Sequence, residues 1–473
     1  MKYYLLPLLL FFALPVLPQN NSAQVQTRID SLLAGSFFDT TQISVDVYDL
    51  TSKINLYRRN EKYLLRPASN MKILTTSAAL VFLGPDYNFT TSLYYTGEIK
   101  NEILYGDIYV VGGCDPDFTT KDLDLFASVI KAAGISEIRG NLIGDVSMMD
   151  SLNWGKGWMW DDDCAYLTPL DINANSIGVI VKPGIIGQKA IIKLIPQTDF
   201  IEFNNSAVTV PADKPGTFTI DKDWLNHKNL ITLKGSVSAK IIPDSLQDTI
   251  YIKIHEPEKY FLTLFRETLR KRGVNISGDN YIAFMPLYSK NLFSLKRKFR
   301  GVINNLNKES YNLGAEMTLR ALAVQYAGKP ATAYKGVRMI DSLITLTGLN
   351  PKSYRIVDGS GISHYNLVST QLLLEVLKYM YFQKPELCKI LYKSFPVAGT
   401  DGTLSNRMKD SPAQNRVNAK TGTLSGVSSL SGYITADNGH LLAFSIILQG
   451  FTGSAKETKD YEDKICSILS EYK

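Results

Sequence analysis

Apolar and polar residues alternate over residues 43–50, which is the two-residue period of a half-buried β-strand. Residues 54–58 repeat the pattern after a short turn, so we predict a β-hairpin. Helical spacing follows: a helix is expected to begin at Ser69 and to end at Gly84-Pro85. A hairpin therefore leads directly into a buried helix that begins with a serine.

The pattern changes between residues 89 and 287, where short strand-like runs are separated by clusters of turn residues. One convincing helix, residues 121–133, interrupts them. We predict that residues 89–287 form one or more inserted β-rich domains, one nested in another. The basic segment 289–300 is expected to be a linker.

Helical periodicity returns after this segment. We predict helices over residues 310–327, 370–382 and 455–472. Residues 429–435 and 441–449 are expected to pair as a hairpin, because Asp437-Asn438-Gly439 between them is a strong turn signal. The chain is thus of the α+β class.

Composition supports a folded chain of several domains. At 473 residues it is too long for one ordinary core, and we expect two or three domains. Hydrophobic residues at 45% and charged residues at 20% are globular values and exclude a disordered chain. The net charge of +6 is scattered, without a basic stripe interleaved with aromatic residues, so no nucleic-acid partner is expected.

The first residues have the pattern of a secretory signal. Lys2 is followed by an apolar run over residues 5–17, and Ser22 and Ala23 offer small residues for cleavage. The run is shorter than the ~20 residues of a spanning helix, although a retained membrane anchor is the alternative. We predict a signal peptide over residues 1–23 and an exported, periplasmic or loosely envelope-associated protein.

The four cysteines have no metal-ligand spacing, and no cofactor or metal is expected. Export permits disulfides, and Cys114 with Cys164 and Cys388 with Cys466 are the pairs suggested by position. Four buried thiols are the favoured alternative.

Ser69 and Lys72 form an S-x-x-K motif, in which serine and lysine share one helix face. A lysine of lowered pKa can activate a serine nucleophile. The motif recurs at residues 128–131 and 470–473, but there the lysine lies toward a helix C-terminus, where the dipole favours it without a catalytic role. At the predicted helix start of Ser69, unpaired N–H groups can also stabilise an oxyanion.

Two further motifs follow in order: Ser310-Tyr311-Asn312 and Lys420-Thr421-Gly422. The set S-x-x-K, S-x-N, K-T-G resembles the active-site serine penicillin-binding proteins and β-lactamases. About 240 residues separate the first two motifs, which resembles the class C low-molecular-mass penicillin-binding proteins, the penicillin-binding protein 4 type D-alanyl-D-alanine carboxypeptidase/endopeptidases. Four segments resemble the same family: residues 113–116, 158–162, 358–361 and 398–404.

The resemblance implies a penicillin-recognising serine-acylase domain, a five-stranded antiparallel sheet flanked by helices. This catalytic domain would be split into residues 24–88 and 288–473 around the insertion. It would act on peptidoglycan stem peptides and be acylated by β-lactams. A serine β-lactamase or a catalytically idle penicillin-recognising protein is the alternative. The oligomeric state, and the balance of carboxypeptidase and endopeptidase activity, stay open.

The resemblance also implies roles. Ser69 would be the nucleophile and Lys72 its base, with Lys420 as a second cation that lowers the pKa of Lys72. Ser310 would pass a proton to the leaving amine, and Asn312 would orient Lys72. The K-T-G segment would bind the substrate carboxylate, through residues Thr421, Gly422 and Thr423.

Three more positions resemble the family's substrate pocket. Asp162, with Tyr166 nearby, matches the position that pairs with an amino-bearing peptide side chain. His364 follows the D-G-S-G-I-S segment where the family often has an arginine. This departure from the family's pattern puts the recognition of a substrate carboxylate by this part of the pocket in question.

Overall fold

The computed structural model describes residues 21–162, 164–240 and 248–473. Most of the predicted signal peptide, residues 1–20, lies outside the described residues. The description begins with helix α1 (Asn21–Leu32). Within the described ranges, no helix combines the length and the apolar character needed to cross a membrane.

A five-stranded antiparallel sheet organises the part of the chain that carries the motifs, and its predicted presence is confirmed. The strand order is β19-β20-β21-β1-β2, so the first and last parts of the sequence share one sheet. The strands are β1 (Gln42–Asp49), β2 (Ile54–Arg59), β19 (Val417–Leu424), β20 (Val427–Thr435) and β21 (Leu441–Gln449).

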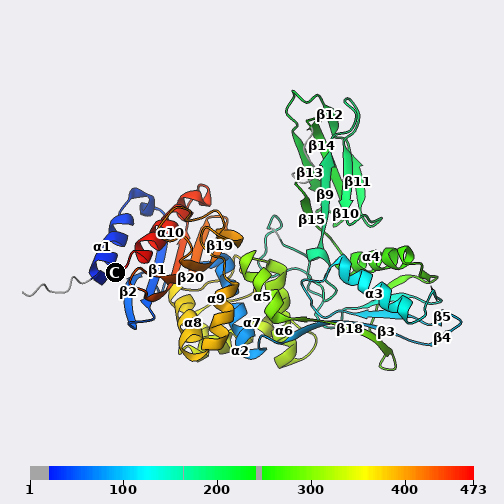
Figure 1. Ribbon diagram of the computed structural model, residues 1–473, viewed down its shortest axis with the longest axis horizontal. Coiled ribbons are helices and arrows are strands. Elements are labelled where there is room, and N and C mark those ends of the chain that lie inside the picture. Colours follow the sequence, from blue (N-terminus) through cyan, green and yellow to red (C-terminus); the bar gives the residue numbers. More distant parts are fainter. Residues whose placement is uncertain (1–20, 163, 241–247) are drawn as a thin grey trace, which may run out of the picture.

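Both faces of this sheet are covered (Figure 1). Phe444 and Ile446 of β21 pack in a cluster with residues of α1 and α10 (Ala455–Ser470), whereas Ala443 and Ile447 pack in the opposite cluster. Successive side chains of a strand point to opposite faces, so β21, which is covered on both sides, is largely apolar. Strand β1 is also buried on both faces, including Ser44 and Asp46, so the expectation of a half-buried strand is wrong in this respect. The opposite face is covered by a helical layer: α2 (Met71–Phe82), α5 (Phe299–Lys308), α6 (Asn312–Ala327), α7 (Ala333–Leu346), α8 (Thr370–Gln383) and α9 (Pro385–Ser394).

The intervening residues build a second body with two sheets, at the lower right of Figure 1. One sheet has the order β17-β8-β6-β3-β18 and the other β16-β7-β5-β4, with α3 (Thr120–Ala132) and α4 (Pro257–Lys271) packed on them. The strands are β3 (Asn88–Tyr95), β4 (Glu98–Lys100), β5 (Ile103–Tyr105), β6 (Ile108–Val111), β7 (Glu137–Ile138), β8 (Leu142–Asp145), β16 (Asn275–Ile276), β17 (Asn280–Ile282) and β18 (Lys290–Lys298).

The expectation that residues 289–300 form a linker is wrong. Residues 290–298 are strand β18, which pairs antiparallel with β3 along its whole length. The segment lies at the edge of its sheet, where charged side chains on a strand are favourable because they discourage further pairing. The basic side chains of this segment favoured a linker, because its partner strand β3 lies some 200 residues earlier in the sequence.

A third, smaller body projects from the second, at the top of Figure 1. It contains a three-stranded sheet, β10-β9-β15, and a four-stranded one in which β14 pairs with β11, β12 and β13. Its strands are β9 (Ser176–Lys182), β10 (Ile191–Ile195), β11 (Glu202–Asn205), β12 (Val208–Val210), β13 (Phe218–Lys222), β14 (Leu230–Ser238) and β15 (Ile250–Lys253).

The cysteines are buried thiols, in agreement with the favoured expectation. The alternative pairing of Cys114 with Cys164 and of Cys388 with Cys466 is wrong. Cys388 lies 3.4 Å from the Tyr433 hydroxyl, and Cys466 packs between α10 and the sheet. Each thiol serves as a small core residue.

Candidate active site

Ser69 lies in a single 3-10 turn, Ala68–Asn70, that runs directly into α2. Ala68 holds a left-handed φ of 47°, unusual for a residue with a side chain. Two glycines let other segments approach this turn: a Cβ on Gly361 would lie 1.9 Å from the Ala68 carbonyl oxygen, and one on Gly422 would lie 2.9 Å from the Ser69 nitrogen. Close backbone packing thus fixes the serine in place.

Lys72 is fully buried and lies one turn beyond the serine. Its Nζ lies 2.8 Å from Ser69 Oγ, 2.7 Å from Asn312 Oδ1 and 2.7 Å from the Ser360 carbonyl oxygen. A neutral amine has two N–H donors and one lone pair. The two carbonyl oxygens match the two donors, which leaves the lone pair for the Ser69 hydroxyl proton.

Burial lowers the pKa of Lys72 to about 7, although the nearby carboxyls of Asp358 and Glu316 act in the opposite direction. Burial also lowers the pKa of Lys420 well below its ordinary value, and the charge of Lys72 lowers it further. The expectation that Lys420 lowers the pKa of Lys72 is therefore wrong: burial lowers the pKa of both amines, and the repulsion between them lowers that of Lys420.

The second motif spans the start of α6. Asn312 is the first residue of that helix, and its side chain meets Lys72. Ser310 lies two residues earlier, half-buried, with a left-handed φ of 57°. Such a backbone conformation is costly at a serine and is found where the surrounding structure requires it.

The third motif lies in β19, beside the Ser69 turn. Lys420 is fully buried, and its Nζ donates to the Thr421 carbonyl at 2.8 Å. The Thr421 hydroxyl donates to Thr403 Oγ1 at 2.7 Å. The Asn70 amide lies 2.6 Å from the Lys420 carbonyl oxygen, which ties the start of α2 to the strand. Thr423 lines the cavity in front of Ser69.

The sequence motifs did not reveal a buried carboxylate pair behind Lys72. Glu316 accepts hydrogen bonds from the backbone N–H groups of Gly359 and Ser360, at 2.9 and 2.8 Å, and pairs with Arg320 at 2.6 Å. Asp358 accepts from the N–H groups of residues 361 and 363. Together they hold the loop whose Ser360 carbonyl contacts Lys72. The D-G-S-G turn was the available signal, but nothing in that motif indicates this role.

A cavity of about 530 Å³ opens in front of the serine. His364 and Asp162 both line it, with His364 Nε2 3.9 Å from Asp162 Oδ1. On its other side, His364 Nδ1 lies 3.0 Å from a guanidinium nitrogen of Arg66. Arg66, which comes from another segment, therefore places a guanidinium group beside His364. The residues that line the Ser69 cavity are Ser69, Met159, Asp161, Asp162, Asn312, Gly361, Ile362, His364, Thr423, Leu424 and Ser425.

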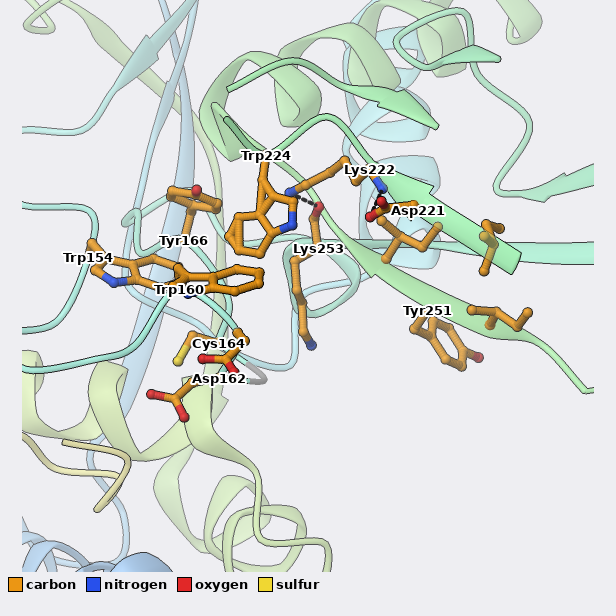
Figure 2. A pocket seen from close by; sticks show the side chains of 14 residues that line it. Trp154, Trp160, Asp162, Cys164, Tyr166, Asp221, Lys222, Trp224, Tyr251 and Lys253 are labelled. Atoms are coloured by element: carbon orange, nitrogen blue, oxygen red, sulfur yellow. Dashed lines mark hydrogen bonds between the residues drawn. The ribbon is translucent and has the colours of Figure 1, made fainter. Parts of the chain in front are cut away.

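Tyr166 faces an adjoining aromatic cavity, which Asp162 also lines (Figure 2). Its ring lies 4.9 Å from the ring of Trp154, and Lys222 Nζ lies 5.5 Å from its centre. The structure thus places Asp162 between the two cavities and Tyr166 on the far side.

The chain is similar to known proteins over nearly its whole length. The model of the D-Ala-D-Ala carboxypeptidase 3 (S13) family matches residues 25–472. A D-alanyl-D-alanine carboxypeptidase of an Actinomadura strain is 31% identical, over 99% of this chain and 89% of its own length. The DacB carboxypeptidase of Haemophilus influenzae is 28% identical, over 92% and 95%. The crystal structure of penicillin binding protein 4 from that organism has a TM-score of 0.81 at 24% identity, over 94% of this chain and 99% of its own.

Proposed function

Because this chain belongs to the D-Ala-D-Ala carboxypeptidase 3 (S13) family, it is a serine-type D-Ala-D-Ala carboxypeptidase or endopeptidase, and we propose that Ser69 is its nucleophile. The observation that carries the assignment is the contact of Ser69 Oγ with a fully buried lysine amine, at 2.8 Å. An amine of pKa about 7 is substantially neutral at neutral pH. It can therefore act as a general base.

In acylation, Lys72 takes the Ser69 hydroxyl proton while Oγ attacks the carbonyl carbon of the penultimate D-alanine. The developing oxyanion is bound by the N–H groups of Ser69 and Thr423, in the arrangement that stabilises such charge. Gly422 supports this placement, because it allows β19 to approach the Ser69 nitrogen closely. The peptide C–N bond then breaks, and the leaving amine receives a proton through Ser310.

Deacylation repeats the same steps with water as the nucleophile. Lys72 takes a proton from the water, the ester bond to Ser69 breaks, and the serine regains its proton. Asn312 holds the amine in position throughout, since its Oδ1 lies 2.7 Å from Nζ. Lys420, Thr421 and Thr423 provide a strand of amine and hydroxyl hydrogen-bond donors for the substrate's terminal carboxylate.

We further propose that the substrates are peptidoglycan stem peptides and that β-lactams acylate the same serine. Asp162 lines the Ser69 cavity and suits an ammonium group on the stem peptide. His364, supported by Arg66, occupies the corner where the family often carries an arginine.

The apolar run of residues 5–17 supports a proposal of export to the cell envelope, where such a substrate is found. Mass spectrometry of the mature protein tests this: a new N-terminus near residue 23 is expected. An intact Met1 would contradict cleavage.

Digestion of purified muropeptides tests the activity. Wild-type protein is expected to release D-alanine from pentapeptide stems, or to cleave cross-linked dimers, and Ser69→Ala to do neither. Ser128→Ala, which changes the serine of another S-x-x-K segment, is the matched control and should retain activity. Rapid turnover of penicillin without muropeptide cleavage would instead favour a β-lactamase.

A further inference from the structure

All four tryptophans of the chain line one cavity beside the Ser69 cavity. Its volume is about 980 Å³, within the range of small-molecule sites. The chemistry proposed above uses none of these indoles. Four indoles around one cavity therefore indicate a ligand-binding site.

Two different segments supply the aromatic walls (Figure 2). Trp154, Trp160 and Tyr166 come from the loop that follows β8, while Trp224 follows β13 in the third body. The rings of Trp160 and Trp224 meet edge to face at 4.9 Å. The cavity thus lies between two bodies of the protein, a common location of ligand sites.

Part of the aromatic lining is exposed, whereas Trp158 is buried and its indole N–H donates to Asp358. Trp160 is 65% exposed and Leu225, at the rim, is 93% exposed. A large apolar patch of this kind marks a binding surface more often than chance exposure. Within the described residues, the protein itself does not cover it.

The rim is polar and of mixed charge. Asp161, Asp162, Asp221, Lys222 and Lys253 line the narrower part of the same aromatic region. Lys222 Nζ donates to the Lys253 carbonyl at 2.7 Å, and burial lowers the pKa of Lys222 to about 8. Opposite charges lie close together, so the rim offers hydrogen-bond donors and acceptors without a strong net field. This favours a neutral, polyhydroxylated ligand over an ion.

Flat apolar walls with a polar rim match a pyranose ring, which presents C–H groups on its faces and hydroxyl groups at its edge. Aromatic side chains supply rigid, amphipathic contact area for such a ring. Asp161 and Asp162 line both the Ser69 cavity and the narrower cavity, and the narrower cavity shares Trp160 and other aromatic residues with the tryptophan cavity, so the three adjoin one another. Stem peptides are attached to glycan strands, and a substrate entering the Ser69 cavity therefore brings sugars with it.

We propose that the tryptophan cavity binds sugar rings of the peptidoglycan glycan strand while a stem peptide occupies the Ser69 cavity. This proposal rests on the function assigned above. It makes Trp160 and Trp224 determinants of substrate size: they favour stems that are still attached to glycan over free peptides.

The binding test uses the Ser69→Ala protein, so that no turnover occurs, with a β-1,4-linked N-acetylglucosamine tetramer as probe. Saturable quenching of tryptophan fluorescence is expected, with matching heat in calorimetry. Trp160→Ala and Trp224→Phe, each in this background, should weaken binding at least fivefold. Phe284→Ala removes an aromatic ring that is 80% exposed elsewhere and should not. No saturable binding, or equal binding by all variants, would overturn the proposal.

A kinetic test uses the active protein. Trp160→Ala should raise KM for a glycan-bearing pentapeptide muropeptide at least fivefold, while kcat/KM for the free pentapeptide stays within twofold of wild type. An equal loss of kcat/KM on both substrates would show that the cavity binds the stem peptide itself, and would overturn the glycan assignment. If wild-type protein cleaves neither substrate, the proposed function fails, yet the tetramer titration still decides whether the cavity binds sugar.

Discussion

Replacing Lys72 by arginine would place a permanent cation beside Ser69 and remove a group that can be neutral near pH 7. With a pKa of about 7, roughly three quarters of Lys72 is neutral at pH 7.5. With an ordinary lysine pKa the fraction would be about one in a thousand, and for arginine it is far smaller. The acylation rate of Lys72→Arg is therefore expected to fall by about 10³-fold or more.

The assay is the second-order rate constant for labelling by fluorescent penicillin between pH 5 and 9. A base must be neutral to accept a proton, so the wild-type rate should rise about tenfold per pH unit and level off above a midpoint near 7. Lys131→Arg, in another S-x-x-K segment, is the matched control and should follow the wild-type curve. A flat wild-type profile, or near-normal labelling of a folded Lys72→Arg, would refute the reasoning.

Three further substitutions probe the site and the sheet. Asn312→Ala removes an acceptor 2.7 Å from Lys72 Nζ, and penicillin labelling should slow about 10- to 100-fold; an unchanged rate would exclude a positioning role. Gly361→Ala would place a Cβ 1.9 Å from the Ala68 carbonyl at a φ of +87°, so urea unfolding should show a loss of about 2–4 kcal/mol, and equal stability would contradict the packing. Burial raises the pKa of Asp46 to about 7, so its folded form binds a proton more tightly than its unfolded form, and stability falls as pH rises from about 4 to 7. Asp46→Asn should thus be more stable than wild type, by about 1–3 kcal/mol at pH 8 and by less at pH 5; a larger gain at pH 5 would reverse the sign.

The sequence was sufficient to predict the strands that the first and last parts of the chain contribute to the central sheet, and the helix that follows Ser69. Alternation in β1 and the Asp437-Asn438-Gly439 turn are local signals, and the register of Ser69 and Lys72 is a property of one helical turn. These features depend on neighbours in sequence. For that reason they could be found without a structure.

Features that depend on distant partners could not be found in this way. The strand character of residues 290–298 requires β3 as its partner. The carboxylates of Glu316 and Asp358 reach the Lys72 neighbourhood only when the loop after residue 357 packs on α6. Likewise, the pairing of Arg66 with His364 joins segments almost 300 residues apart.

The central claim is that Ser69 forms the acyl-enzyme, and the most direct measurement is mass spectrometry of the penicillin-treated protein. Intact mass should increase by one penicillin, and peptide mapping should place the adduct on the peptide that contains Ser69. The Ser69→Ala protein should gain no mass. An adduct on another residue, or labelling that persists in Ser69→Ala, would contradict the account.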